Sequence, residues 1–146
     1  MNAIQAVGLT KKYKGVTAVD GLDLSIRSGE LFSLLGVNGA GKTTTIKMLS
    51  CLTQPTSGDA LFGGMSIKKD PAAVKRIIGV SPQETAVAPN LTVHENLELM
   101  CGVRGYSRAR SRERAAELSE EFGLGEVSGR KAGKLSGGWQ RRLSIA

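Results

Sequence analysis

The chain has 146 residues, of which 40% are hydrophobic and 4% aromatic, and its formal net charge is +7. This length and apolar content fit one ordinary domain with an aliphatic core. The sequence contains no apolar run of about 18 residues or more, which excludes a helix of the membrane-spanning type within it. The basic balance is compatible with nucleic acid, with an anionic membrane surface, or with binding of one highly charged anion.

The N-terminal part of the chain has the signals of β-structure. Residues Ile4–Tyr13 and Leu22–Ile26 are predicted to be strands, and in the second the apolar residues alternate with Asp23 and Ser25. Lys14-Gly15 predicts a turn between them. We therefore expect the two strands to pair antiparallel.

A glycine-rich loop follows a short apolar run. Glu30–Leu35 is predicted to be a buried strand, and Thr43–Leu52 has helical periodicity. The loop between them has the form G-x-x-x-x-G-K-[ST], in which glycines let backbone N–H groups converge on nucleotide phosphates. Lys42 would then place a positive charge at the β- and γ-phosphates, and Thr43 a hydroxyl at Mg²⁺. The alternative is a flexible glycine turn without a ligand. The candidate phosphate-binding residues are Gly36, Val37, Asn38, Gly39, Ala40, Gly41, Lys42, Thr43 and Thr44.

Short elements are predicted after this loop. Ala60–Phe62 is expected to be a strand. Pro71–Lys75 is expected to be a helical turn or two, with Asp70 as its N-cap. Ile77–Val80 is expected to be a buried strand that ends at the turn Ser81–Gln83.

From Glu84 onward the sequence has the signals of helices. Thr92–Glu95 is a capping box that predicts the start of one helix, and Ser107–Phe122 predicts a second. Leu135–Gly138 precedes a third, predicted over Trp139–Ala146. This last helix reaches the final residue without a stop signal, so we expect that the chain has been cut.

The densest basic run, Arg104–Arg114, alternates with helix formers and is interleaved with and followed by acidic residues. This pattern predicts a solvated helix face with ion pairs four residues apart, rather than a nucleic-acid surface. The acidic residues are Glu113, Glu117, Glu120 and Glu121.

Three of these stretches together resemble the ATP-binding subunit of ABC transporters. They are the phosphate loop Gly36–Thr44, the turn Ser81–Gln83 and the segment Leu135–Gln140. The last is similar to the family signature L-S-G-G-Q, with Trp139 where the commonest form has Gln. Tyr13 matches an aromatic residue upstream of the loop. The resemblance covers the whole chain and implies an α/β fold: a P-loop NTPase core with an N-terminal antiparallel β portion and a helical insert, as an incomplete ABC ATPase domain.

The resemblance also implies roles for single residues. Tyr13 would stack on adenine; the alternative is an ordinary tyrosine at a strand end. Lys42 and Gln83 would be catalytic, and Gln83 would ligate Mg²⁺ with Thr43 and orient the attacking water, unless it is a plain turn residue. Ser136–Gly138 (Ser136, Gly137 and Gly138) would bind the γ-phosphate of ATP held by a second subunit; the alternative is a simple serine N-cap.

The family pattern is not complete in this sequence. In the family, an apolar strand after the signature helix ends in an Asp and a Glu, and a switch histidine follows further on. The resemblance therefore implies that these 146 residues are a poor ATPase and marginally folded, because phosphoryl transfer needs positioning, metal and oriented water together. A parallel sheet without its central strands would also leave Leu31–Leu35 and Ile77–Val80 uncovered.

The expected organisation is a β-rich phosphate-loop core over residues 1–83, a helical subdomain over 84–134, and the signature with its helix over 135–146. The implied partners are ATP with Mg²⁺, a second ATP-binding subunit, and a transmembrane permease that Glu84–Gly102 would contact at the cytoplasmic face of the membrane. The sequence style of the loop favours an exporter, and no nucleic-acid partner is expected. Two alternatives stay open: a non-transport ABC ATPase acting on nucleic acid or the ribosome, and a truncated remnant that binds ATP without hydrolysis.

Overall fold

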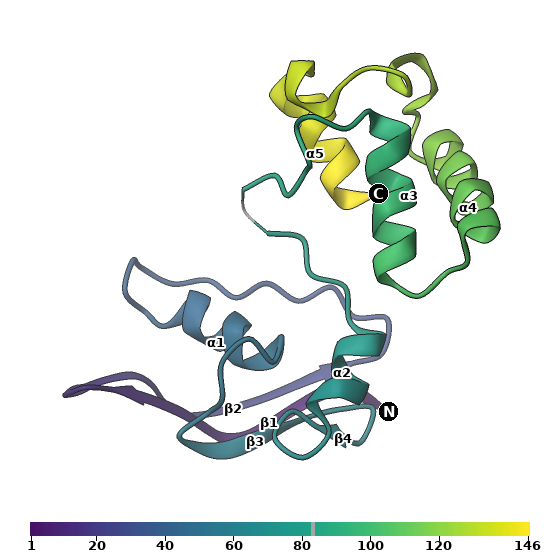
Figure 1. The fold of residues 1–146 in the computed structure, drawn as a ribbon. Coiled ribbons are helices and arrows are strands. Elements are labelled where there is room, and N and C mark those ends of the chain that lie inside the picture. The colour runs from purple at the N-terminus through teal and green to yellow at the C-terminus, as the bar shows by residue number, and fades with distance from the viewer. Residues whose placement is uncertain (83) are drawn as a thin grey trace. The chain divides into compact units, whose positions relative to one another are not determined.

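The computed structural model describes residues 1–82 and 84–146, which fall into two compact units. The N-terminal unit comprises residues 1–80 and the C-terminal unit residues 81–146. Figure 1 shows the β-structure in the first unit and the long helices α3 and α4 in the second. The predicted division into three parts stays a prediction.

The N-terminal unit is built on a four-stranded antiparallel sheet with the strand order β2-β1-β3-β4. The predicted hairpin is confirmed, since β1 (Asn2–Tyr13) and β2 (Val16–Arg27) pair along their length. Strand β3 (Ser57–Phe62) contains the predicted Ala60–Phe62 and pairs with β1, and β4 (Met65–Ser66) completes the sheet. The alternation predicted in the second strand also holds, because Leu22, Leu24 and Ile26 are half-buried while the residues between them are exposed.

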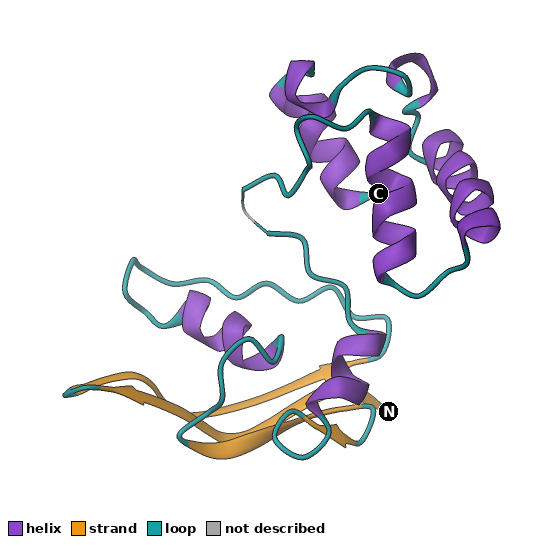
Figure 2. Ribbon diagram, viewed as in Figure 1, coloured by secondary structure: helices purple, strands orange, loops and turns teal. Residues whose placement is uncertain are grey.

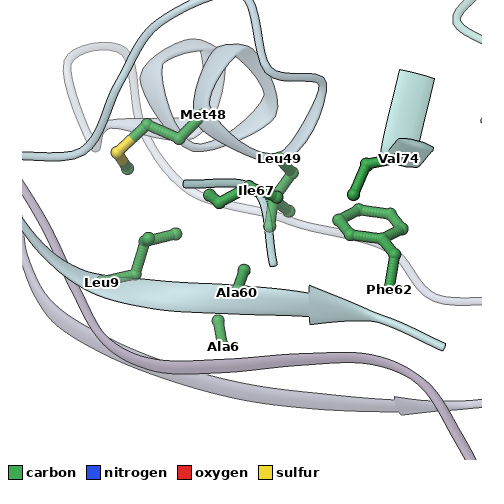
Figure 3. Packing of buried hydrophobic residues seen from close by; sticks show 8 residues of the cluster. All are labelled: Ala6, Leu9, Met48, Leu49, Ala60, Phe62, Ile67 and Val74. Carbon is green, nitrogen blue, oxygen red and sulfur yellow. The ribbon is translucent and has the colours of Figure 1, made fainter. Parts of the chain in front are cut away.

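Two helices cover one side of this sheet, as Figure 2 shows. Helix α1 (Lys42–Leu49) follows the phosphate loop, and α2 (Pro71–Ile77) begins with the predicted proline at its first position. The Asp70 side chain makes no cap bond to α2; its carboxylate accepts the backbone N–H of Ser66 instead. Figure 3 shows the core between helices and sheet, and its buried members are Ala6, Leu9, Met48, Leu49, Ala60, Phe62, Ile67 and Val74.

Two predicted strands are wrong. Residues 30–35 have no regular structure, and Leu31 and Leu35 are 97% and 87% exposed. Ile77 is the last residue of α2, and residues 78–80 are irregular, with Val80 53% exposed. A strand exists only through hydrogen bonds to a neighbour, and no described strand lies beside either segment. The expectation that their apolar side chains are uncovered is confirmed in part: Leu34 and Ile78 are half-buried, and Ile78 packs against the core of the N-terminal unit.

The helix after the phosphate loop is also shorter than predicted. It ends at Leu49, and Leu52 lies beyond it, 69% exposed. Ile46 within the helix is 49% exposed, so only Met48 and Leu49 of the predicted apolar face are buried. The apolar periodicity therefore predicted a longer buried helix face than the structure has.

The C-terminal unit packs three helices and two short 3-10 turns around a second core. The helices are α3 (Val93–Val103), α4 (Arg108–Glu121) and α5 (Gly137–Ile145), and the 3-10 turns are η1 (Gly125–Val127) and η2 (Ala132–Lys134). The predicted capping box is confirmed: the Thr92 hydroxyl accepts the Glu95 N–H, and the Glu95 carboxylate accepts the Thr92 N–H. The core residues are Val93, Leu97, Ala115, Leu124, Val127, Ala132, Leu135 and Leu143.

Buried Asn96 fixes the segment that leads into α3. Its side-chain oxygen accepts the Ala88 N–H at 2.7 Å, and its amide nitrogen donates to the carbonyls of Ala88 and Thr92 at 3.1 and 2.8 Å. A buried amide costs free energy unless it is hydrogen-bonded, and here both ends of the side chain are satisfied. The turn over residues 88–92 is therefore held against the first turn of α3.

Candidate nucleotide-binding site

The phosphate loop ends in a backbone conformation that favours glycine. Gly39 and Gly41 have φ angles of +87° and +81°, and Gly41 is the N-cap of α1. The Gly41 carbonyl accepts the first helical hydrogen bond, from Thr45 N–H at 2.8 Å. The loop therefore delivers the chain to the N-terminus of α1, where free N–H groups and the helix dipole favour an anion.

The phosphate loop approaches the β1–β2 hairpin closely at Gly41. A Cβ on Gly41 would lie 2.3 Å from the carbonyl oxygen of Ala18 and 3.0 Å from a methyl carbon of Val19, both on β2. Glycine is the residue that permits this approach. On the same hairpin, Tyr13 pairs with Val16, two residues before Ala18, so the loop and the Tyr13 end of the hairpin belong to one region of the N-terminal unit.

Lys42 is held by the loop itself. Its ammonium donates to the carbonyl oxygens of Gly36 and Val37, at 2.6 and 2.7 Å. An ammonium has three donors, so these two bonds leave one for another acceptor. The arrangement fixes a positive charge beside the start of α1. Thr43, the next residue, is exposed, while Thr44 is half-buried.

The other loop residues of the candidate set, Asn38 and Ala40, are exposed along with Val37. Ala40 N–H donates to the Val37 carbonyl at 3.2 Å, which closes a turn inside the loop. The nine candidate residues thus form one continuous exposed or half-buried segment, apart from its backbone contact with β2.

Tyr13 lies at the end of β1 and is 48% exposed. The Lys11 ammonium lies over its ring, 5.2 Å from the centroid. An aromatic ring in this position can stack on a base. Lys11 belongs to none of the sequence motifs, and the sequence pattern does not predict a role for it.

The signature residues form the start of α5 in the C-terminal unit. Ser136 is the N-cap, Gly137 and Gly138 are the first helical residues, and all three are exposed. The helix begins two residues before the predicted Trp139. The Ser136 hydroxyl makes no cap bond to this helix, so the hydroxyl and the N-terminal N–H groups of α5 are available to an acceptor.

Gln140, which the sequence analysis placed in the signature segment without a role, supports the start of α5. The side-chain amide of Gln140 donates to the carbonyls of Ala132 and Leu135, at 3.1 and 3.3 Å. It thereby ties η2 and the residue before Ser136 to the first turns of α5. A glutamine one residue past the signature was the available signal, but its partners are seen only in the fold.

Trp139, the departure from the commonest signature, faces inward. It packs against the core of the C-terminal unit, and the Arg142 guanidinium lies over its ring at 4.6 Å from the centroid. The substitution is therefore accommodated by packing and by a cation–π contact. Gln83, predicted to be catalytic and to ligate metal, lies outside the described residues.

Comparison with known proteins identifies the family. Residues 19–146 match a family described as ABC transporter. The chain belongs to this family. The resemblance predicted from the motifs is confirmed, and so is the α/β class with an antiparallel N-terminal β portion and helices after residue 84.

Relatives of known function are similar over almost the whole chain. The chain is 49% identical over 144 residues to a daunorubicin/doxorubicin resistance ATP-binding protein of Streptomyces peucetius, covering 99% of the chain and 44% of that protein. It is 44% identical over 142 residues to a linearmycin resistance ATP-binding protein of Bacillus subtilis, covering 97% of the chain and 46% of that protein. The chain thus spans less than half the length of these relatives.

Solved structures of ABC proteins have the same fold. The ATP-binding subunit of an ABC transporter superimposes with a TM-score of 0.83 at 26% identity, over 98% of this chain and 60% of that one. A dimeric ATP-binding cassette in a post-hydrolysis state, bound to ADP and Pi, gives 0.81 at 30% identity, over 97% and 67% of the two chains.

Proposed function

We propose that this chain is the ATP-binding part of an exporter-type ABC transporter subunit, which binds ATP and hydrolyses it to drive transport. The observation that carries the proposal is the phosphate loop: the Lys42 ammonium is fixed by two loop carbonyls at the N-terminus of α1, beside exposed loop backbone. Charge, helix dipole and free N–H groups then act on one anion. Curated relatives named as drug-resistance ATP-binding proteins support the exporter assignment.

Magnesium fits the same end of α1. Thr43 is exposed and directly follows Lys42, so its hydroxyl is an available oxygen ligand, the type that Mg²⁺ prefers. The metal would neutralise charge on the β- and γ-phosphates. Gln83 is the second proposed ligand, on the resemblance alone. A Thr43→Val variant should lose the part of ATP affinity that depends on Mg²⁺ and keep the part measured with EDTA.

The remaining candidate residues would bind the adenine base and the ATP of a second subunit. Tyr13 would stack on adenine, and its half-exposed ring on the hairpin that contacts Gly41 supports this. Ser136, Gly137 and Gly138 would bind the γ-phosphate of ATP held by a second subunit, because the exposed start of α5 offers a hydroxyl and N–H groups to an anion. Two subunits would then clamp two ATP molecules between them.

ATP binding is tested by thermal unfolding of the chain with a lysine pair. ATP at about 100 times its dissociation constant should add about 2.7 kcal/mol to the free energy of unfolding, seen as a higher melting temperature. Lys42→Ala should abolish the shift. Lys47→Ala is the matched control, since Lys47 is an exposed lysine in the last turn of the same helix. A wild-type chain whose melting temperature ignores ATP would refute the proposal.

Hydrolysis by these 146 residues alone should be slow. The family pattern places an acidic pair after the signature helix, and the last helix here runs to Ile145. Without a general base the positioned water is not activated. We expect a turnover below about 1 per second, the low end of ordinary enzymes. A purified chain that melts cooperatively and hydrolyses ATP faster than this would contradict the expectation.

The proposed docking surface for the permease partner lies on the C-terminal unit. Helix α3 exposes several apolar side chains, and a shallow cavity of about 410 Å³ is lined by residues of α3, of α4 and of the connection between them. The exposed side chains of α3 are Leu99, Met100 and Val103, and Tyr106 is exposed in the connection to α4. No helix among the described residues is both long and apolar enough to cross a bilayer. We propose that this surface docks on a transmembrane subunit at the cytoplasmic face of the membrane.

The nucleic-acid alternative loses its main support in the structure. Arg110 and Arg114 bond to Glu117 at 3.2 and 2.8 Å, and Arg112 lies 3.6 Å from Glu98. These arginines already face carboxylates, which leaves less charge for phosphates. The pairs within α4 are three and seven residues apart, so the predicted spacing of four is wrong although the face does carry ion pairs. Binding to duplex DNA or tRNA that weakens steeply with salt would restore the alternative; salt-independent behaviour would end it.

A further inference from the structure

The Tyr13 ring is covered on one face by a cation. The Lys11 ammonium lies over the ring at 5.2 Å from its centroid, within the range of cation–π attraction. The ring is still 48% exposed. The contact with Lys11 thus leaves about half of the residue accessible to a ligand.

Lys11 is itself held in place by the segment that follows α1. Its ammonium donates to the Gln54 carbonyl at 2.6 Å. The backbone beside it is also tied down, since Lys12 N–H donates to the Thr56 hydroxyl at 3.0 Å and Thr56 N–H donates to the Thr10 carbonyl at 2.8 Å. The cation over Tyr13 is therefore anchored to the chain only a few residues after the helix that carries Lys42.

We propose that Lys11 is a positioning residue of the nucleotide site: it packs against one face of Tyr13 and holds the ring so that the opposite face receives a purine base. The inference rests on the proposed function, in which Tyr13 stacks on adenine. Its energetic basis is preorganisation, because a ring fixed before binding loses less rotational freedom when the base arrives. The anchor at Gln54 links the base end of the site to the segment after α1.

The test separates the base from the phosphates. Affinities for ATP and for inorganic tripolyphosphate are measured on the whole chain carrying Lys11→Met, Lys11→Arg or Lys12→Met. Lys11→Met removes the charge and keeps the length, and should weaken ATP binding about 2- to 5-fold while leaving tripolyphosphate binding unchanged. Lys11→Arg should restore ATP affinity. Lys12→Met is the matched control, an exposed neighbour whose side chain alternates to the other face of β1, and should behave as wild type.

A double-mutant cycle identifies the route of the effect. In a Tyr13→Ala background, Lys11→Met should have no further effect on ATP affinity, because the two side chains act as one unit. Unchanged ATP affinity in Lys11→Met, or an equal loss for ATP and tripolyphosphate, would overturn the inference and leave the phosphate site intact. A wild-type chain that binds neither ligand would instead refute the proposed function, and with it the inference.

Discussion

At the scale of single residues, Gly41 is where conformation and packing both exclude a side chain. Its φ of +81° belongs to the left-handed region, and an added Cβ would lie 2.3 Å from the Ala18 carbonyl. Left-handed strain alone costs about 1–2 kcal/mol, and Gly41→Ala should destabilise the N-terminal unit by more than this. It should also weaken ATP binding, because the loop must move away from β2. Urea unfolding followed with and without ATP measures both effects.

Gly39→Ala is the control for this prediction. Gly39 has a similar φ of +87°, but an added Cβ would meet no atom within 4 Å. It should cost only the strain of about 1–2 kcal/mol. Equal losses of stability in the two variants would show that contact with the hairpin has no energetic role, and that strain alone explains glycine at both positions.

Residues whose role is local were predicted from the sequence, and residues whose role depends on the fold were not. The glycine loop, Lys42 and the Thr92 cap are defined by neighbours within a few positions, so they can be recognised from the sequence alone. Lys11 and Gln140 act through carbonyls up to 43 residues away, at Gln54 and Ala132 respectively. No spacing rule predicts such partners, which is why neither role was predicted.

At the scale of elements, the start of α3 makes the fold sensitive to pH. The Thr92 backbone N–H, and then the Thr92 hydroxyl, lower the pKa of the Glu95 carboxyl below its ordinary value of 4.5. A lowered pKa in the folded state means that Glu95 stabilises the fold above its unfolded pKa, and that this contribution is lost as the pH falls through the folded pKa. Wild type should therefore lose its advantage over Glu95→Gln as the pH falls below the ordinary pKa of 4.5.

The cap variants complete this experiment, with the melting temperature followed by helical circular dichroism. Thr92→Ala should cost about 1 kcal/mol at neutral pH and should reduce the pH dependence, because the hydroxyl that contributes to the Glu95 pKa shift is gone. Thr92→Ser keeps the hydroxyl and should retain both stability and pH dependence. A difference between wild type and Glu95→Gln that stays constant with pH would contradict the assignment.

Helices and the hairpin were predicted well, whereas the two strands of parallel-sheet type were not. The capping box, the Ser107 N-cap and the alternation in β2 act within one element or one hairpin. The runs at 30–35 and 77–80 have the composition of buried strands, but composition does not supply a neighbour to bond with. Among the described residues no strand does so, and most of the apolar side chains stay exposed, whereas Leu34 and Ile78 are half-buried.

At the scale of the whole molecule, two separate cores divide the chain. One core lies between sheet and helices in residues 1–80, and the other lies among α3, α4 and α5 in residues 81–146. Leu9 and Leu124 are fully buried members of the first and the second core. Composition predicted one aliphatic core for a chain of this length; the contacts form two, because the apolar residues on either side of residue 80 cluster separately.

A substitution in one core should therefore destabilise that unit and leave the other unit folded. Leu9→Ala should destabilise the N-terminal unit by about 2–5 kcal/mol, the cost of a buried cavity, and speed amide hydrogen exchange in β1, β3 and α1 while leaving α3–α5 protected. Leu124→Ala should do the reverse. Leu31→Ala is the control, because Leu31 is 97% exposed and should change stability by less than about 0.5 kcal/mol. If Leu9→Ala exposed the amides of both units equally, the two cores would have to unfold as one cooperative structure.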